Sequence, residues 1–396
     1  MRNRFADKKT QSSVMERVAC AILFLLFAFF WLYAFQADVM AVAQHGLSGG
    51  RTHYDRTVGA VIISGVLIAL QLLVYALTRL QRHCHVLTYV PSFLLLAFVS
   101  SISHPFRWGA WPLAAVVVMA LWGGAVWLAR RSSTLLIGQQ RAPGIFSRSM
   151  WVNMLGMGVM MLAVAAVSNT NAVLHFKAHD EVAFMRGDSH EVLRTGQRSH
   201  ESDASLTMLR ALALSQNGLL ADALFTYAVS GNGDDLLPLD GSQSTLMLMP
   251  DTLLYDHFGL RPDSLRARMD SAARALPLTT RRYLDSLQRD TNATAAWRDY
   301  RLMGLLIDRR LDDFASLLPR HYALSADSLP RHYREALVLY QQTADTLFIY
   351  SDTLMLRRYR DYRSNDTLYR HPDERLLRTI EDYGDTYWHY YDEQLY

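Results

Sequence analysis

Five apolar segments in the first 171 residues constrain the fold of this chain more than any other feature. They cover residues 18–35, 58–77, 86–102, 111–128 and 150–167. A helix rises about 1.5 Å per residue, so roughly 20 residues cross a hydrocarbon core of about 30 Å. None of the segments contains an acidic or basic residue, and tryptophan or tyrosine near their ends suits a membrane interface. We therefore predict about five transmembrane helices in residues 1–171.

The third segment decides the side on which the rest of the chain lies. It is the shortest of the five and contains Thr88, Pro91 and Ser92. With five crossings the two ends of the chain lie on opposite sides of the membrane, and with four they lie on the same side. A cleaved signal peptide is an alternative for the first segment, because Ala41-Val42-Ala43 resembles a cleavage site.

Charge is divided unevenly along the chain. Residues 1–171 hold 14 bases and 4 acids, a net charge of +10, whereas residues 172–396 hold 26 bases and 33 acids, a net charge of −7. With a cytoplasmic N-terminus and five crossings, 11 bases lie in cytoplasmic pieces and only Arg51, Arg56 and Arg107 lie in the opposite loops. Cytoplasmic loops are rich in bases, so residues 172–396 are expected outside the cytoplasm. Their acidity disfavours nucleic-acid binding.

Residues 172–396 show helical periodicity. Leu206, Leu209 and Leu212 precede an Asn217-Gly218 turn, and a second apolar series follows it, which predicts two short helices within 205–227. A small residue followed four positions later by an aromatic, as at Ala223 and Tyr227, resembles a tetratricopeptide repeat, although the proline of that pattern is displaced. Residues 300–319 and 333–340 predict further helices, and 230–250 a long loop. The expected fold is all-α: a transmembrane domain (1–171) followed by a TPR-like helical-repeat domain (172–396), with a non-repeat helical bundle as the alternative.

One tripeptide recurs after residue 250: Asp, followed by either Ser or Thr, followed by either Leu or Ala. It occurs eight times, where ordinary composition gives roughly two. Aspartate with serine or threonine caps helices, which is one explanation. The other is covalent modification, because the tripeptide resembles an O-glycosylation signal of extracytoplasmic proteins in Bacteroidota. The hydroxyls concerned belong to Thr252, Ser264, Ser271, Ser286, Ser328, Thr346, Thr353 and Thr367.

Two longer motifs carry a further resemblance. They are DSLPRHYREALVLY, residues 327–340, and YGDTYWHYYDEQLY, residues 383–396. Together with the order of membrane helices and repeat-like helices, they resemble a family of uncharacterised Bacteroidota multi-pass inner-membrane proteins with a TPR-like periplasmic domain. The resemblance implies a location and an architecture but no reaction.

Signs of chemistry are few. His175, His179 and Asp180 share a stretch after the fifth segment, and His83, Cys84 and His85 share a loop, but neither set has the spacing of a metal site. No phosphate loop, dinucleotide fingerprint or nucleophile elbow is found, so we predict no catalytic, cofactor or metal residues. The absence of ionisable residues from the five segments also argues against an ion pathway. Gly123-Gly124 and Gly156-x-Gly158 predict close helix packing.

The C-terminus is strongly aromatic. Tyr387, Trp388, Tyr390 and Tyr391 could form a docking surface for a partner, because tyrosine and tryptophan dominate binding hot spots, or a last helix that caps the array. The sequence thus predicts a membrane-anchored scaffold that contacts lipids and binds a protein or peptide in the periplasm. It could also be a subunit of a larger envelope complex. The alternative is an envelope enzyme or transporter subunit that acts on glycan or lipid at the membrane face.

Overall fold

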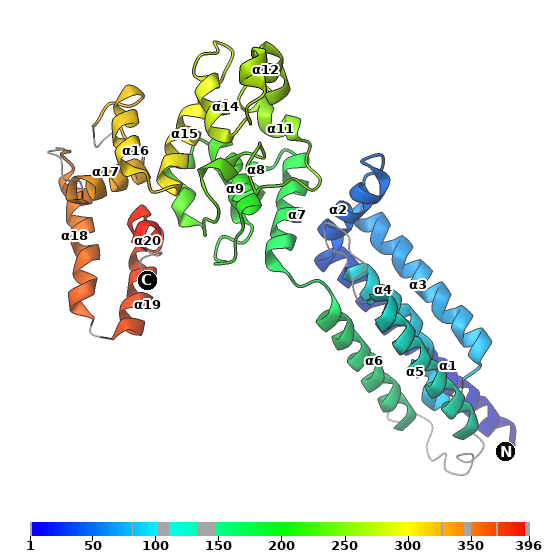
Figure 1. Ribbon diagram of the computed structural model, residues 1–396. Helices are drawn as coiled ribbons and strands as arrows, with labels where there is room; N and C mark the ends of the chain where they lie inside the picture. Colours follow the sequence, from blue (N-terminus) through cyan, green and yellow to red (C-terminus); the bar gives the residue numbers. More distant parts are fainter. Residues whose placement is uncertain are drawn as a thin grey trace. The chain divides into compact units, whose positions relative to one another are not determined.

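Every regular element in the described part of the chain is a helix (Figure 1). The computed structural model describes residues 2–80, 82–101, 111–132, 148–325, 328–343, 350–369 and 371–392. Within these ranges it does not describe the side chains of 2–13, 82, 83, 132, 366, 367 and 372. The chain divides into two compact units, Met1–Asn171 and Ala172–Tyr396. Each unit has its own hydrophobic core.

The first unit is a bundle of long apolar helices. Among the residues that the structure describes, four stretches are long and apolar enough to cross a membrane: Val14–Phe35, Arg56–Thr78, Trp111–Arg131 and Arg148–Val167. The helices of the unit are α1 (Arg2–Phe30), α2 (Ala37–Ser48), α3 (Arg56–Thr78), α4 (Val90–Ser100), α5 (Trp111–Ser132) and α6 (Arg148–Val167). A π-turn, η1 (Trp31–Phe35), continues α1, and a 3-10 segment, η2 (Arg82–Tyr89), precedes α4. Large apolar side chains such as Leu113, Leu121 and Leu162 are at least 70% exposed, as expected where lipid replaces water.

The third predicted segment differs from the others because it lies inside the bundle. The apolar helix Cys84–Ser100 is shorter than the four candidate spans. Its polar side chains Thr88, Ser92 and Ser100 are fully buried. Gln71 Nε2 of α3 donates to Thr88 Oγ1 at 2.9 Å, and Ser92 Oγ donates to the Leu67 carbonyl at 2.8 Å. Buried polar groups are stable only when they are hydrogen-bonded. The surrounding helix α3 supplies these partners, which explains how the segment can contain polar residues.

The bundle also buries two ionisable residues that lie just outside the apolar segments predicted from the sequence. Helix α1 extends towards the N-terminus beyond the predicted segment 18–35 and so includes Glu16 and Arg17. Glu16 is 1% exposed and accepts a hydrogen bond from Ser149 Oγ at 3.2 Å. His85, in η2, is 4% exposed and contacts the rings of Tyr75 and Tyr89. Ionisable groups are therefore present inside the folded bundle, and their absence no longer argues against an ion pathway.

Of the four glycines expected at helix contacts, one lies at such a contact. A Cβ at Gly156 would come within 2.9 Å of Val86 Cγ2, so α6 and η2 approach closely there. At Gly123, Gly124 and Gly158 a Cβ would meet no described atom within 4 Å, so the described residues form no close helix contact there.

The second unit is built from short helices. It begins with α7 (Ala172–Met185), α8 (Ser189–Arg194), α9 (Ala204–Gln216) and α10 (Leu220–Ala223), which continues into η3 (Leu224–Thr226). The 3-10 segment η4 (Gly233–Leu236) is followed by α11 (Asp251–Asp256), α12 (Pro262–Arg268), α13 (Ser271–Arg274) and α14 (Thr280–Leu287). The last elements are α15 (Ala296–Ile307), α16 (Leu311–Leu317), η5 (Leu318–Arg320), α17 (Arg331–Thr343), α18 (Thr353–Leu368), α19 (Pro372–Tyr383) and α20 (Tyr387–Asp392).

The predicted helix pairs are present with unequal members. Helices α9 and α10 meet at Asn217-Gly218, where Gly218 takes a φ of 68° that glycine adopts without strain. The second helix of the pair, however, has only four α-helical residues before it tightens into η3. Helices α15 and α16 form the pair expected at 300–319, and α17 covers the helix expected at 333–340.

The last residues of the loop predicted at 230–250 are held by one buried carboxylate, whereas Asp235 and Asp308 bind the earlier part. Glu181 of α7 is fully buried, and its carboxylate accepts hydrogen bonds from three successive backbone N–H groups. The donor nitrogens belong to Met247 at 2.9 Å, Leu248 at 2.5 Å and Met249 at 2.7 Å. Burial raises the pKa of Glu181, and these three backbone donors act in the opposite direction. The loop is therefore fixed to α7 although it contains little regular structure.

Replacing Glu181 with glutamine is expected to release this loop, because the amide group of glutamine brings its own N–H donors to a site that supplies only donors. The loss of charge-assisted bonds should lower the local stability by about 2–4 kcal/mol. Hydrogen–deuterium exchange of the full-length protein in detergent would then be faster in peptides covering 244–250. Glu201→Gln, at an exposed position, is the matched control, and equal exchange in both variants would contradict the expectation.

Candidate functional site

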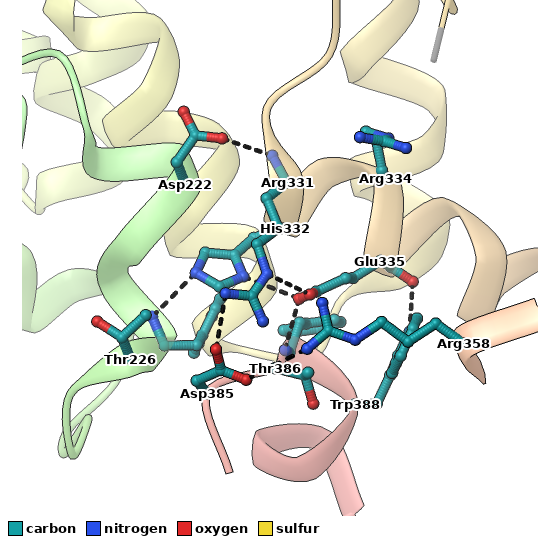
Figure 2. Close-up of polar contacts among 12 residues, drawn as sticks. Asp222, Thr226, Arg331, His332, Arg334, Glu335, Arg358, Asp385, Thr386 and Trp388 are labelled. Carbon is teal, nitrogen blue, oxygen red and sulfur yellow. Dashed lines mark hydrogen bonds and ion pairs between the residues drawn. The ribbon is translucent and has the colours of Figure 1, made fainter. Parts of the chain in front are cut away.

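A buried charged cluster joins the two sequence motifs of the C-terminal region (Figure 2). Its centre is the start of α17, which carries Arg331 and His332 in its first turn and Glu335 one turn later. The side chains of His332 and Glu335 are 0% exposed. Arg331 reaches two carboxylates, with Nε at 2.8 Å from Glu335 Oε1 and Nη1 at 2.8 Å from Asp385 Oδ2. Its backbone N–H also donates to Asp222 Oδ1 of α10 at 2.6 Å.

Glu335 receives donors from both motifs. In addition to Arg331, His332 Nδ1 lies 2.9 Å from Oε2, and the backbone N–H of Tyr387 donates to the same oxygen at 2.8 Å. Burial alone would raise the pKa of Glu335, but the hydrogen bond from His332, the charge of Arg331 and the Tyr387 N–H together lower it. Glu335 is therefore an ionised carboxylate whose acceptor capacity is used inside the fold.

The tautomer of His332 follows from its second contact. The backbone N–H of Phe225 donates to His332 Nε2 at 3.3 Å, so this nitrogen is an acceptor and Nδ1 carries the proton towards Glu335. A histidine paired with a carboxylate is also the arrangement of many general bases. Here both side chains are closed off from solvent, which leaves no route for a substrate. The pair therefore links α17 to η3 and α20.

The aromatic C-terminus occupies this cluster. Tyr387 and Trp388 are 0% exposed, and Trp388 Nε1 donates to the Glu335 carbonyl at 2.8 Å. Tyr390 and Tyr391 are half-buried, and Tyr390 Oη donates to the Ile307 carbonyl at 3.0 Å. Of the docking surface predicted from the sequence, Tyr387 and Trp388 are thus closed to a partner. Solvent reaches only Tyr390 and Tyr391.

A second buried charge lies in α7. Asp180 is 0% exposed, and neither carboxylate oxygen meets hydrogen-bond geometry with a partner that the structure describes. Arg210 of α9 is 1% exposed and lies over the ring of Tyr227, with its Cζ 5.2 Å from the ring centroid. Burial raises the pKa of Asp180 to about 8, against the smaller lowering effects of the Thr195 hydroxyl and the Arg210 charge. This region holds a carboxyl group that binds its proton at neutral pH.

A polar pocket of about 360 Å³ opens between a loop and two helices. The loop contributes Pro238, Leu239 and Asp240. Helix α11 contributes Asp251, Thr252 and Tyr255, and the α12 region contributes Arg261, Pro262, Asp263 and Arg266. From the sequence, two of these aspartates stood out only as parts of the repeated tripeptide. Nothing in the sequence pattern signalled that they share a pocket with Asp240.

The hydroxyls of the tripeptides lie in differing surroundings. Ser264, Ser271, Ser328 and Thr353 are exposed, whereas Thr252 and Ser286 are half-buried. Ser286 Oγ donates to the Arg282 carbonyl at 2.8 Å. Thr346 and the side chain of Thr367 lie outside the described residues.

The capping explanation applies to some of the tripeptides. Asp270 accepts from the Ala273 N–H at the start of α13, and Asp352 accepts from the Met355 N–H at the start of α18. Asp251 and Asp263 lie in first turns, but Asp285 lies inside α14 and caps no helix start. Capping therefore does not account for every occurrence.

Two further constellations resemble parts of chemical sites. Ser215 Oγ lies 2.7 Å from His257 Nε2, the geometry of a nucleophile and its base. No described side chain hydrogen-bonds the other ring nitrogen of His257, and neither residue lines the pocket, so the pair lacks the remaining parts of a hydrolytic site. His179 pairs with Glu191 at 3.1 Å. Among the described residues, no group of three histidine, cysteine or acidic side chains is placed to hold a metal.

Comparison with known proteins identifies one family. Residues 260–394 match the model of a family of unknown function, DUF6057. The match includes α17 and α20, with Arg331, His332 and Glu335 of the charged cluster, but covers about a third of the chain. Curated proteins give no match. Solved structures give none either.

Proposed function

We propose that this protein is a membrane-anchored binding module with a non-catalytic role. In this proposal residues 1–171 cross the cytoplasmic membrane five times with the N-terminus inside. Residues 172–396 form a helical, TPR-like domain in the periplasm that binds a protein or peptide. The observation that carries the proposal is the change at residues 171–172. A bundle that exposes leucine and valine gives way there to a charged unit with its own core.

Two features support the details. The buried segment Cys84–Ser100 packs its polar side chains on its neighbours, as a lipid-shielded central span would. The pocket in the second unit supplies a concave polar surface. The aromatic groups that the sequence offered for docking are largely used within the fold, so the pocket is the better candidate for contact with a partner.

Topology and partner binding can be tested separately. Protease treatment of spheroplasts is expected to digest residues 172–396, because the distribution of loop charges favours a position outside the cytoplasm. Protection of these residues would refute the orientation. For binding, cross-linking in intact cells followed by purification in mild detergent should retain a protein partner. Recovery of the chain without any cross-linked protein across growth conditions would contradict the binding role and favour an enzyme or transporter subunit that acts on glycan or lipid.

A further inference from the structure

The pocket between residues 238–240, α11 and the α12 region has a charge balance that specifies its occupant. Its lining includes three aspartates and two arginines. Arg266 Nη2 contacts Asp240 Oδ2 at 2.7 Å, and the same oxygen accepts the Leu278 N–H at 2.8 Å. Arg261 makes a bidentate pair with Asp256, at 2.8 and 2.9 Å. Both arginines are therefore neutralised by acids of the same region.

Asp251 and Asp263 are the two acids of the lining that do not pair with Arg261 or Arg266. Both are exposed, and each lies in the first turn of its helix. Ionised carboxylates only accept hydrogen bonds, so a ligand must bring donors, and positive charge is favoured. The net charge of −7 on residues 172–396 adds to this preference.

The walls of the pocket are suited to an aliphatic chain. Most of the pocket surface is polar, but the half-buried Pro238 and Leu239 contribute an apolar part, and Pro262 and Tyr255, which are nearly buried, also line it. Tyr255 is 3% exposed, and its hydroxyl donates to the Pro238 carbonyl at 3.4 Å, so the ring presents no competing donor. Lysine and arginine combine an apolar stem with a charged end, and commonly bury the stem while the charge stays at the rim.

We propose that this pocket binds a basic side chain, lysine or arginine, of the partner peptide, with Asp251 and Asp263 as its charge partners and the proline-lined wall against its stem. The inference rests on the proposed binding function and names the chemistry of its partner. Thr252 lies in the same lining, so a glycan on its hydroxyl would occupy the space that the side chain needs.

The test uses the full-length protein in detergent micelles and two blocked pentapeptides. Acetyl-Ala-Ala-Lys-Ala-Ala-amide carries the charge, and the same peptide with norleucine carries only the stem. Binding is followed by saturation-transfer difference NMR. The lysine peptide is expected to bind about tenfold more tightly, the factor that two partly exposed ion pairs supply together. The double variant Asp251→Asn/Asp263→Asn should lose this preference and keep its circular dichroism spectrum.

Asp312→Asn is the matched control, because Asp312 is also an acid in the first turn of a short helix but does not line the pocket. It should retain the tenfold preference. Equal binding of the two peptides, no binding to the parent protein, or the same loss in Asp312→Asn would overturn the pocket assignment. Retention of a cross-linked partner by the Asp251→Asn/Asp263→Asn protein, together with failure of the peptide test, would reject the pocket while leaving the binding role intact.

Discussion

Replacing Glu335 with glutamine is expected to detach the C-terminal segment from the second unit. The carboxylate accepts from Arg331, His332 and the Tyr387 backbone, and all three donors would face a group that supplies only one acceptor oxygen. Arg331 keeps Asp385 as a partner, but buried donors of His332 and Tyr387 lose their shared acceptor, and each unsatisfied buried donor costs about 1–3 kcal/mol. Hydrogen–deuterium exchange should become much faster in peptides covering 383–392, with no change in the first unit.

Glu381→Gln makes the same chemical change at the surface. Glu381 pairs with Arg378 at 3.0 Å, and its side chain is 67% exposed. Such pairs contribute less than about 1 kcal/mol, so exchange in 383–392 should stay at its original rate. If Glu335→Gln and Glu381→Gln behaved alike, the charged cluster would not be what holds the C-terminus.

The second large effect concerns Asp180, whose buried carboxyl group makes the folded state less stable as the pH rises. Its pKa is raised to about 8 by burial, whereas a carboxyl group in an unfolded chain titrates near about 4. Between these two pKa values, the folded state therefore holds a proton that the unfolded state has released. The stabilisation is complete below about pH 4 and is lost progressively up to about pH 8. Because a tenfold difference in proton affinity between the two states is worth about 1.4 kcal/mol, the total change is on the order of 5 kcal/mol.

Asp180→Asn should remove most of this pH dependence. The charges that face this position are Arg210 of α9 and, on α7 itself, His179 and Glu181. An amide does not ionise, so protection of α7 and α9 against exchange should stay nearly constant between about pH 5 and 8, and exceed that of the parent protein at the upper limit. Asp361→Asn, at an exposed position of α18, should leave the pH dependence unchanged. A parent protein with no pH dependence in these helices would contradict a proton-binding role for buried Asp180.

The sequence predicted those parts of the fold that depend on local pattern. Hydropathy located the four long apolar helices, and the Asn217-Gly218 turn located the junction of α9 and α10. Both signals come from residues close together in the chain. The helix formed by a run of apolar residues, and the turn formed at a glycine with positive φ, depend mainly on residues close by in the sequence.

The candidate sites could not be predicted because they join distant residues. Glu335 meets Tyr387 across 52 positions, and Glu181 meets Met247 across 66. The aromatic residues of the C-terminus marked it as unusual, but composition alone does not separate a packed interior from an exposed surface. Likewise, the tripeptide marked Asp251 and Asp263, whereas the pocket depends on how α11 and α12 meet the loop at 238–240.

The central position of the segment Cys84–Ser100 has a consequence for the order of synthesis. Its N–H at Val86 donates to Asn153 Oδ1 at 3.0 Å, and Asn153 belongs to α6, which begins at Arg148. When the ribosome has made only residues 1–110, this hydrogen-bond partner does not yet exist. If residues 1–171 span the membrane as proposed, we expect the segment to wait beside the insertion machinery, or at the membrane surface, until α6 emerges. Ribosome-stalled chains ending before Arg148 should therefore leave it unintegrated, and chains that include Val167 should integrate it.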